Sequence, residues 1–183
     1  MSDVTQQIYE QTLVLRSQLD DEAAFRELLE LHGPPVLAFI RRMMQSAPDR
    51  VDDLAQEIWV AIYRSLPKLE DAGKFRPWAF RIARDRIYRE YRRRRIAIDC
   101  AEDGELENLP AIAEVLPAIE IEALQRGLDV ISPQHREVLI LSFFQEMSYE
   151  EIARVTGSTL GTVRSRIHYA KRALKNALER NPL

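Results

Sequence analysis

Three groups of side chains with different binding chemistry follow one another in the middle of this 183-residue chain. Asp53, Gln56 and Glu57 combine carboxylates with an amide, Trp78 lies within an aromatic cluster, and residues 92–95 are consecutive arginines. Carboxylates suit a basic protein surface, aromatic rings stack on bases, and guanidinium groups bind phosphates. The order therefore predicts a protein-docking face, a base-handling face and a phosphate-binding end.

The first group lies on a predicted helix that begins near Asp49 and ends before Pro67. Its inward stripe is defined by helical spacing and comprises Val51, Leu54, Ile58, Ala61 and Ile62. The opposite face holds Asp53, Gln56, Glu57 and Val60. Polar residues on such a face are most often simply solvated. An apolar residue in their middle favours a partner over water.

The aromatic and arginine groups lie on a further predicted helix, from about Pro77 to about Arg94. Trp78, Ile82 and their small neighbours Ala79 and Ala83 are also typical of an ordinary core. The arginines argue for more, because like charges four residues apart repel on a bare helix and phosphate would remove that repulsion. The interleaved rings are suited to stacking on single-stranded bases, and they are Phe75, Phe80, Tyr88 and Tyr91.

A helix-turn-helix is predicted near the C-terminus. Ser148 and Glu151 form a capping box, Gly157 makes the turn, and a longer helix begins near Thr159 or Leu160. A preceding helix is capped by Ser132. The inward positions of the longer helix are Val163, Ile167, Ala170, Leu174 and Leu178, and the outward ones are Arg164, Ser165, His168, Tyr169 and Arg172. The donor-rich outward face suits a DNA major groove, although a solvated helical hairpin would have the same periodicity.

The chain as a whole is predicted to be all-α, with two small helical domains. We expect an N-terminal segment at 1–19, a first domain at 20–95, an acidic flexible linker at 96–118 and a second domain at 119–183. Within the first domain, Asp20 is expected to cap a helix that stops at Gly33-Pro34, with a second helix following from Val36 to Met44.

Charge and composition limit the classes of function that we expect for this chain. The net charge of −3 hides a basic stretch at 81–95, a stretch at 96–125 without any Lys or Arg, and a basic stretch after Arg154. No membrane span or secretory signal is evident, and a lone Cys100 with three histidines predicts neither a disulfide nor a metal site. We therefore expect a cytoplasmic protein without cofactors. No nucleophile with its base is apparent, so an enzyme is not expected.

Taken together, these motifs resemble the extracytoplasmic-function (ECF) sigma factors of bacterial RNA polymerase. The family carries an Asp-x-x-Gln-Glu motif, matched at 53–57, and a Trp before an Arg-Ile-Ala segment, matched at Trp78 and 81–83. It also carries Ser-Tyr-x-Glu-Ile-Ala and Gly-Thr-Val-Arg-Ser-Arg, matched at 148–153 and 161–166. The resemblance implies a sigma factor that binds core polymerase, recognises the minus-ten and minus-thirty-five promoter elements and directs transcription initiation.

The resemblance also implies residue roles and partners. The polymerase-binding residues would be Asp53, Gln56, Glu57 and Val60. The minus-ten DNA-binding residues would be Lys74, Phe75, Trp78, Arg81, Arg84, Asp85, Tyr88, Arg92 and Arg93. The minus-thirty-five DNA-binding residues would be Thr162, Arg164, Ser165, Arg166, His168, Tyr169 and Arg172. Core RNA polymerase, promoter DNA and an anti-sigma factor are the expected partners, with no membrane insertion.

Three residues depart from the family pattern. Asp85 stands where Asn is usual, Ala79 where Leu is common, and Tyr169 where Arg is usual. The first and third changes alter groups expected near bases, and at the base pair beneath Tyr169 this chain is expected to depart from the family. The competing interpretation is a two-domain helix-turn-helix regulator that is not a polymerase subunit. Such a regulator would not need the carboxylates at 53–57 or the arginine run.

Overall fold

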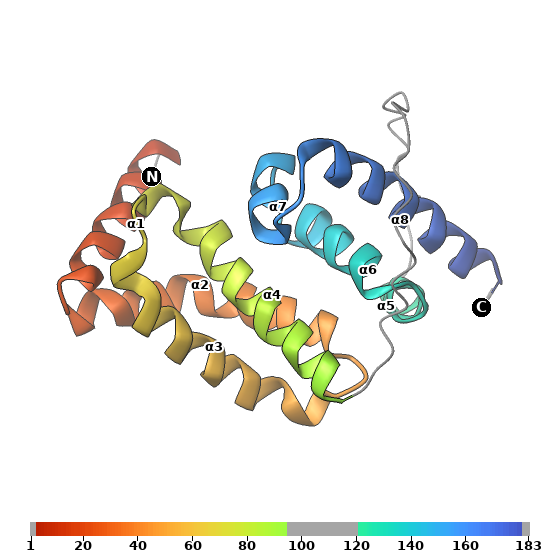
Figure 1. Ribbon diagram of the computed structural model, residues 1–183, viewed down its shortest axis with the longest axis horizontal. Helices are drawn as coiled ribbons and strands as arrows, with labels where there is room; N and C mark the ends of the chain where they lie inside the picture. Colours follow the sequence, from red (N-terminus) through yellow and green to blue (C-terminus); the bar gives the residue numbers. More distant parts are fainter. Residues whose placement is uncertain (1–2, 95–120, 181–183) are drawn as a thin grey trace. The chain divides into compact units, whose positions relative to one another are not determined.

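The computed structural model describes residues 3–94 and 121–180, and every regular element in those ranges is helical. The described chain forms two compact units, divided near Glu90. Figure 1 shows the first built from α1 to α4 and the second from α5 to α8. The prediction of two small all-α domains is confirmed. The predicted acidic linker at 96–118 lies outside the described residues.

The first unit opens with two long antiparallel helices, α1 (Asp3–Gln18) and α2 (Glu22–Met43). The sequence predicted a break at Gly33-Pro34, and that prediction is wrong, since α2 continues through Pro34 and Pro35. An interior proline costs about 3 kcal/mol of helix stability. Burial outweighs this cost, because one continuous stripe is buried on both sides of the prolines: Leu28, His32, Val36, Phe39, Ile40 and Met43.

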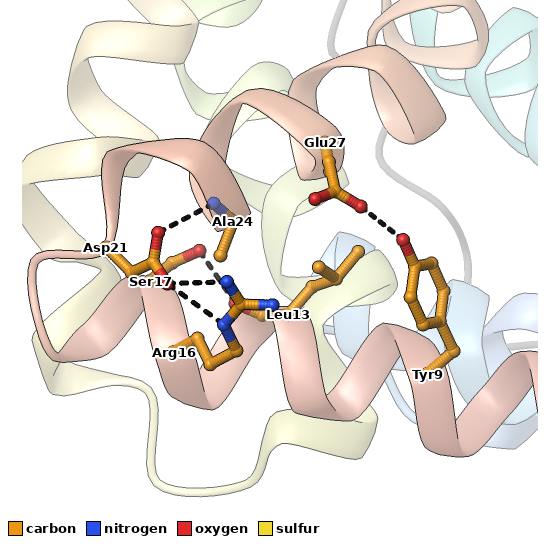
Figure 2. A network of polar contacts seen from close by, with 7 residues as sticks. All are labelled: Tyr9, Leu13, Arg16, Ser17, Asp21, Ala24 and Glu27. Atoms are coloured by element: carbon orange, nitrogen blue, oxygen red, sulfur yellow. Dashed lines mark hydrogen bonds and ion pairs between the residues drawn. The ribbon is translucent and has the colours of Figure 1, made fainter.

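The connection between α1 and α2 is held by a polar network that Figure 2 shows. The N-cap of α2 is Asp21 rather than the predicted Asp20, which instead makes the turn with a φ of 62°. Asp21 accepts a hydrogen bond from the Ala24 amide and pairs with Arg16 at 2.7 Å. These two donors lower the pKa of the Asp21 carboxyl. Residues 3–18, which the sequence analysis left outside the first domain, are thus a packed helix of the first unit.

The rest of the first unit comprises η1 (Pro48–Arg50), α3 (Val51–Ser65), η2 (Leu66–Lys68), η3 (Ala72–Lys74) and α4 (Phe75–Arg93). Aromatic contacts join these helices to α2. The ring centres of Phe25 and Trp59 of α3 lie 6.1 Å apart, and those of Phe39 and Phe80 of α4 lie 5.4 Å apart. The core therefore lies between α2 and the two helices that carry the predicted binding faces.

The second unit comprises α5 (Ile121–Val130), α6 (Pro133–Leu139), a π-helical turn η4 (Ile140–Phe144), α7 (Tyr149–Thr156) and α8 (Leu160–Arg180). The predicted N-cap of α6 is confirmed, because the Ser132 hydroxyl accepts from the His135 amide at 3.2 Å. Arg136 closes the end of α5 by donating to the Leu128 and Asp129 carbonyls at 2.7 and 2.9 Å. This guanidinium satisfies two carbonyls that a helix end would leave without partners.

The predicted helix-turn-helix is confirmed by α7, its turn and α8. Both bonds of the capping box are present, with the Glu151 amide donating to Ser148 and the Ser148 amide donating to Glu151. Gly157 ends α7 with a φ of 68°, the left-handed region that glycine occupies at least cost. The first residues of α8 are capped by the Thr159 hydroxyl, which accepts from the Thr162 amide at 3.2 Å.

Candidate protein and nucleic-acid interfaces

The predicted docking face is exposed on α3. Asp53, Gln56, Glu57 and Val60 are all exposed, and Val60 keeps 49% of its surface accessible. The opposite stripe is buried as predicted at Val51, Leu54, Ile58 and Ile62, whereas Ala61 is only half-buried. An apolar side chain thus lies in the middle of an exposed polar face, as a partner-binding surface requires.

An arginine from outside α3 organises the carboxylates of this face. Arg50 pairs with Asp53 at 2.7 Å, with Glu57 at 3.6 Å and with Glu90 of α4 at 3.5 Å. Arg86 of α4 lies 3.8 Å from the other oxygen of Glu57. The docking carboxylates are therefore held in place before any partner binds. Local spacing does not reveal this arrangement, because Glu90 lies 40 positions after Arg50 and only the fold brings them together.

One outer face of α4 forms the predicted cationic surface. Its members recur at helical spacing, begin with the last residue of η3 and are exposed except for the half-buried Trp78: Lys74, Trp78, Arg81, Asp85, Arg89 and Arg92. We call these six residues the α4 outer stripe. Arg93 and Arg94 are exposed beyond it, and Arg95 lies outside the described residues. The structure thus brings Trp78, Arg81, Asp85 and Arg92 onto one face.

All four interleaved rings of the proposed base-handling cluster, Phe75, Phe80, Tyr88 and Tyr91, are instead core residues. Phe75 and Phe80 are 1% and 0% exposed, and Phe75 packs against His32 of α2 at 5.0 Å. Neither ring can stack on a base in this structure, so that part of the interpretation is corrected. Tyr88 and Tyr91 are buried as well, at 8% and 3% exposure, and the Arg84 guanidinium lies 4.6 Å from the ring centre of Tyr88. The rings of Phe75 and Phe80 are buried because α4 packs one of its faces against α2, and both rings lie on that face.

Trp78 and Lys74 remain accessible at the start of α4. Trp78 is half-buried and lies 6.0 Å from Phe75, so its ring is anchored on the core while part of it faces solvent. Lys74 pairs with Asp71 at 2.7 Å, with both side chains 51% exposed. The hydrogen bonds from Lys74 and from the Gly73 amide lower the pKa of the Asp71 carboxyl. Exposed ion pairs of this kind contribute little to stability, so a phosphate can compete with Asp71 for Lys74.

The outward face of α8 agrees with its prediction. Val163, Ile167, Ala170 and Leu174 are buried, and Leu178 is half-buried. Arg164 and Arg172 are exposed, while Ser165, His168 and Tyr169 are half-buried between them. The rings of His168 and Tyr169 meet edge to face at 5.4 Å. The helix thus presents polar and aromatic donors between two exposed cations.

Three of the predicted α8 contacts are already engaged within the protein. The Ser165 hydroxyl donates to the Thr162 carbonyl at 3.0 Å, and the Thr162 hydroxyl lies 2.9 Å from that of Thr159. Arg166 reaches back to the Ser158 hydroxyl at 3.3 Å and thereby ties the helix to the preceding turn. Arg166 therefore has a structural contact that spacing along α8 does not reveal.

Within residues 3–94 and 121–180, no group of three or more His, Cys, Asp or Glu residues could hold a metal ion. In the same ranges, no helix is long and apolar enough to cross a membrane.

Comparisons with known proteins match both units. Residues 28–96 match Sigma-70 region 2, and residues 121–174 match Sigma-70, region 4. The chain is 31% identical to the RNA polymerase sigma-H factor of Pseudomonas aeruginosa, covering 93% of this chain and 94% of that protein. It is 30% identical to the ECF RNA polymerase sigma factor SigF of Caulobacter vibrioides, covering 92% and 93%.

A solved structure agrees with the fold. It contains the sigma factor RpoE of Bartonella quintana in complex with the anti-sigma factor NepR, with a TM-score of 0.67 and 24% identity over 86% of this chain and 98% of that one. Sequence matches to both regions in their expected order, together with relatives aligned over nearly their whole length, confirm the resemblance. The chain belongs to the ECF RNA polymerase sigma factors, the polymerase-binding subunits that direct transcription initiation.

Proposed function

We propose that α3 docks the chain on core RNA polymerase, while α4 and α8 recognise the minus-ten and minus-thirty-five promoter elements. The observation that carries this proposal is the α4 outer stripe, where four cations outnumber the single carboxylate of Asp85 and lie on one face with the half-buried Trp78. Like charges this close repel unless a polyanion neutralises them. Trp78 adds a partly exposed ring beside the loop that leads into α4.

The two DNA-binding helices have different tasks in this proposal. The start of α4 and the loop before it open the minus-ten element and hold an extruded base, with Trp78 as the accessible ring. The outward face of α8 lies in the major groove of the minus-thirty-five element, where Arg164 and Arg172 hold phosphates and His168 and Tyr169 meet bases. The chain supplies no catalytic group, since the polymerase performs the phosphoryl transfer.

Initiation assays provide the direct test. Purified chain would be added to core polymerase with a library of promoters randomised at both elements. We expect initiation that depends on the chain and selects sequence at two separate positions. DNA binding without polymerase-dependent initiation would instead favour the helix-turn-helix regulator.

The docking face has its own test in Glu57→Lys. This change reverses the charge of a carboxylate that is 50% exposed and adds a cation beside Arg50 and Arg86. We expect at least about tenfold weaker binding to core polymerase, because truncating or reversing a central interface charge typically costs 2 kcal/mol or more. The measurement is competition for core polymerase.

Glu30→Lys is the matched control for that change. Glu30 is exposed on α2, outside the docking face, and the substitution makes the same change in net charge. It should bind as the parent does. Equal affinities for Glu57→Lys and the parent would contradict the assignment of α3 as the docking face.

We also propose that the chain works in the cytoplasm and is controlled by an anti-sigma factor. The similar structure of RpoE was solved with the anti-sigma factor NepR, which motivates the idea. The test is to copurify partners with the tagged chain from its native host and to add each to the initiation assay. An anti-sigma factor must inhibit initiation in proportion to its binding. Copurifying proteins that leave initiation unchanged would contradict the proposal.

A further inference from the structure

The loop between α3 and α4 is attached to α1 at its beginning. The Gln18 side-chain amide donates to the Leu69 carbonyl at 2.7 Å and to the Leu66 carbonyl at 3.0 Å. Both acceptors are main-chain groups of residues that are nearly buried, at 9% and 1% exposure. A side chain with at least two N–H donors in this place can bind both carbonyls at once, and the Leu66 carbonyl also accepts from the Leu69 amide at 3.0 Å. The amide therefore acts as a clamp on the first turn of the loop.

The same helix also contacts the end of the loop. A Cβ atom built on Gly73 would lie 3.0 Å from the Gln11 amide nitrogen, so Gln11 packs directly against this glycine. Gln11 and Gln18 are two turns apart and share one face of α1. Glu10, the residue before Gln11, lies 2.8 Å from His32, and the ring centre of His32 lies 5.0 Å from that of Phe75.

α1 can hold the loop because α1 is itself fixed. Leu13 and Val14 are 1% and 0% exposed. The ion pair of Arg16 with Asp21 and the hydrogen bond of Tyr9 with Glu27 tie the helix to α2 (Figure 2). Contacts of α1 with η2 and η3 complete the attachment. The loop is thus built on a rigid helix, which is what a precise binding site needs.

We infer that α1 positions the loop between α3 and α4, which we call the minus-ten recognition loop. Gln18 is the main positioning residue. This inference rests on the proposed role of the loop and of α4 in minus-ten recognition. The region-2 match begins at residue 28, so α1 lies outside it. The loop runs from the clamped Leu66 and Leu69 to Lys74, and α4 follows from Phe75 and carries Trp78 in its first turn. Its own bond, from the Gly73 amide to Asp71, shapes the turn but does not attach it to the unit.

Gln18→Met in the full-length chain is the test. Methionine has nearly the same length and helix propensity but no donors, so the Leu69 carbonyl loses the Gln18 hydrogen bond and the Leu66 carbonyl keeps only its bond from the Leu69 amide. Initiation with core polymerase would be measured on a reference promoter, on variants changed in the minus-ten element and on variants changed in the minus-thirty-five element. We expect discrimination among minus-ten sequences to fall about tenfold, the equivalent of losing two hydrogen bonds of ordinary strength. Minus-thirty-five discrimination and core affinity should stay unchanged.

Two controls separate positioning from general damage. Gln7→Met makes the same change at an exposed position of the same helix and should match the parent. Gln18→Lys restores donors and should recover most of the minus-ten discrimination, with Gln7→Lys as its control for added charge. Circular dichroism should give the same helix content for every variant.

Several outcomes would overturn the inference. One is an unchanged minus-ten profile for Gln18→Met, and another is an equal loss at both promoter elements together with weaker core binding, which would indicate a purely structural role. A failure of Gln18→Lys to recover any discrimination would also count against it. If the parent itself shows no minus-ten preference, the proposed function fails first, and the parent measurement alone reveals that.

Discussion

At the scale of single residues, the binding faces combine exposed groups with groups that the fold has already engaged. Arg50 holds Asp53 and Glu57 on the docking face, and Arg166 is bound to the turn before α8. Asp85 is exposed on the α4 outer stripe, where it lies 3.3 Å from Arg84. Residue type alone therefore does not decide which of the cations is available to DNA.

Tyr169 provides the residue-scale prediction. It lies half-buried beside His168 on the outward side of α8, where an arginine could instead pair with guanine through two hydrogen bonds. Tyr169→Arg should shift preference toward guanine at one minus-thirty-five position by about 1 to 3 kcal/mol. Promoter selection with parent and variant measures the shift.

The control for Tyr169→Arg is Asn176→Arg, which adds the same cation to an exposed position two turns further along α8. It should strengthen binding to all sequences alike, if it has any effect. Identical motifs recovered by the parent and Tyr169→Arg would mean that residue 169 does not meet a base.

At the scale of the elements, helix ends and turns determine how the binding helices are oriented. The capping box starts α7, Gly157 ends it, and Thr159 caps the first turn of α8. Arg136 closes α5 through two carbonyls, and Gly127 permits a close approach of α5 to α8, since a Cβ there would lie 2.7 Å from Leu174. These local devices set where α8 begins and what it packs against.

At the element scale, we predict that Gly157→Ala and Gly161→Ala change the unfolding free energy in opposite directions. A Cβ at Gly157 would meet no atom within 4 Å, so any cost of Gly157→Ala comes from its φ of 68°. That variant should lose about 1 kcal/mol of unfolding free energy. Gly161 lies in the first turn of α8 with no positive φ and a nearest atom at 3.8 Å. Gly161→Ala should therefore gain roughly 0.4 to 1 kcal/mol.

Both glycine variants would be measured in the full-length chain without DNA, by hydrogen exchange of the α7 and α8 amides. The pair serves as its own control, because each change adds the same methyl group near the same turn. Shifts of equal size and sign would contradict the conformational argument.

At the scale of the whole molecule, charge segregation matters more than net charge. The chain carries −3 overall, yet the α4 outer stripe and the exposed Arg164 and Arg172 of α8 are cationic. Contacts with phosphates release counterions and make DNA binding depend on salt. Sequence selection depends instead on groups that meet bases.

The Arg81→Gln, Arg89→Gln double variant tests this division. Both arginines are exposed on the α4 outer stripe, so each lost phosphate contact should flatten the slope of log affinity against log salt by about 0.7 to 0.9. Affinity of the polymerase complex for promoter DNA would be measured over a range of salt concentrations. Affinity should fall for every promoter alike.

Arg26→Gln, Arg41→Gln is the matched control, since both residues are exposed on α2 and the net charge changes equally. It should keep the slope of the parent. An equal change of slope in the two double variants would show that total charge, rather than the α4 stripe, governs binding.

The sequence by itself determined the features that depend on neighbouring residues. The inward stripe of α3, the capping box of α7 and the turn at Gly157 all follow from local spacing and backbone preference, and the structure confirms them. The family motifs at 53–57, 148–153 and 161–166 are local in the same sense. The docking role of Asp53 to Val60 and the base contacts of α8 stay predictions, because they concern partners.

Only the tertiary structure decided the features that depend on distant residues. Packing on both sides of Pro34 and Pro35 kept α2 in one piece against a local preference to break, and packing against α2 took Phe75 and Phe80 into the core. The clamp of Gln18 joins groups 48 and 51 positions apart. Local sequence preferences do not identify such contacts between distant residues. Burial and hydrogen bonding between segments are determined only when the helices pack.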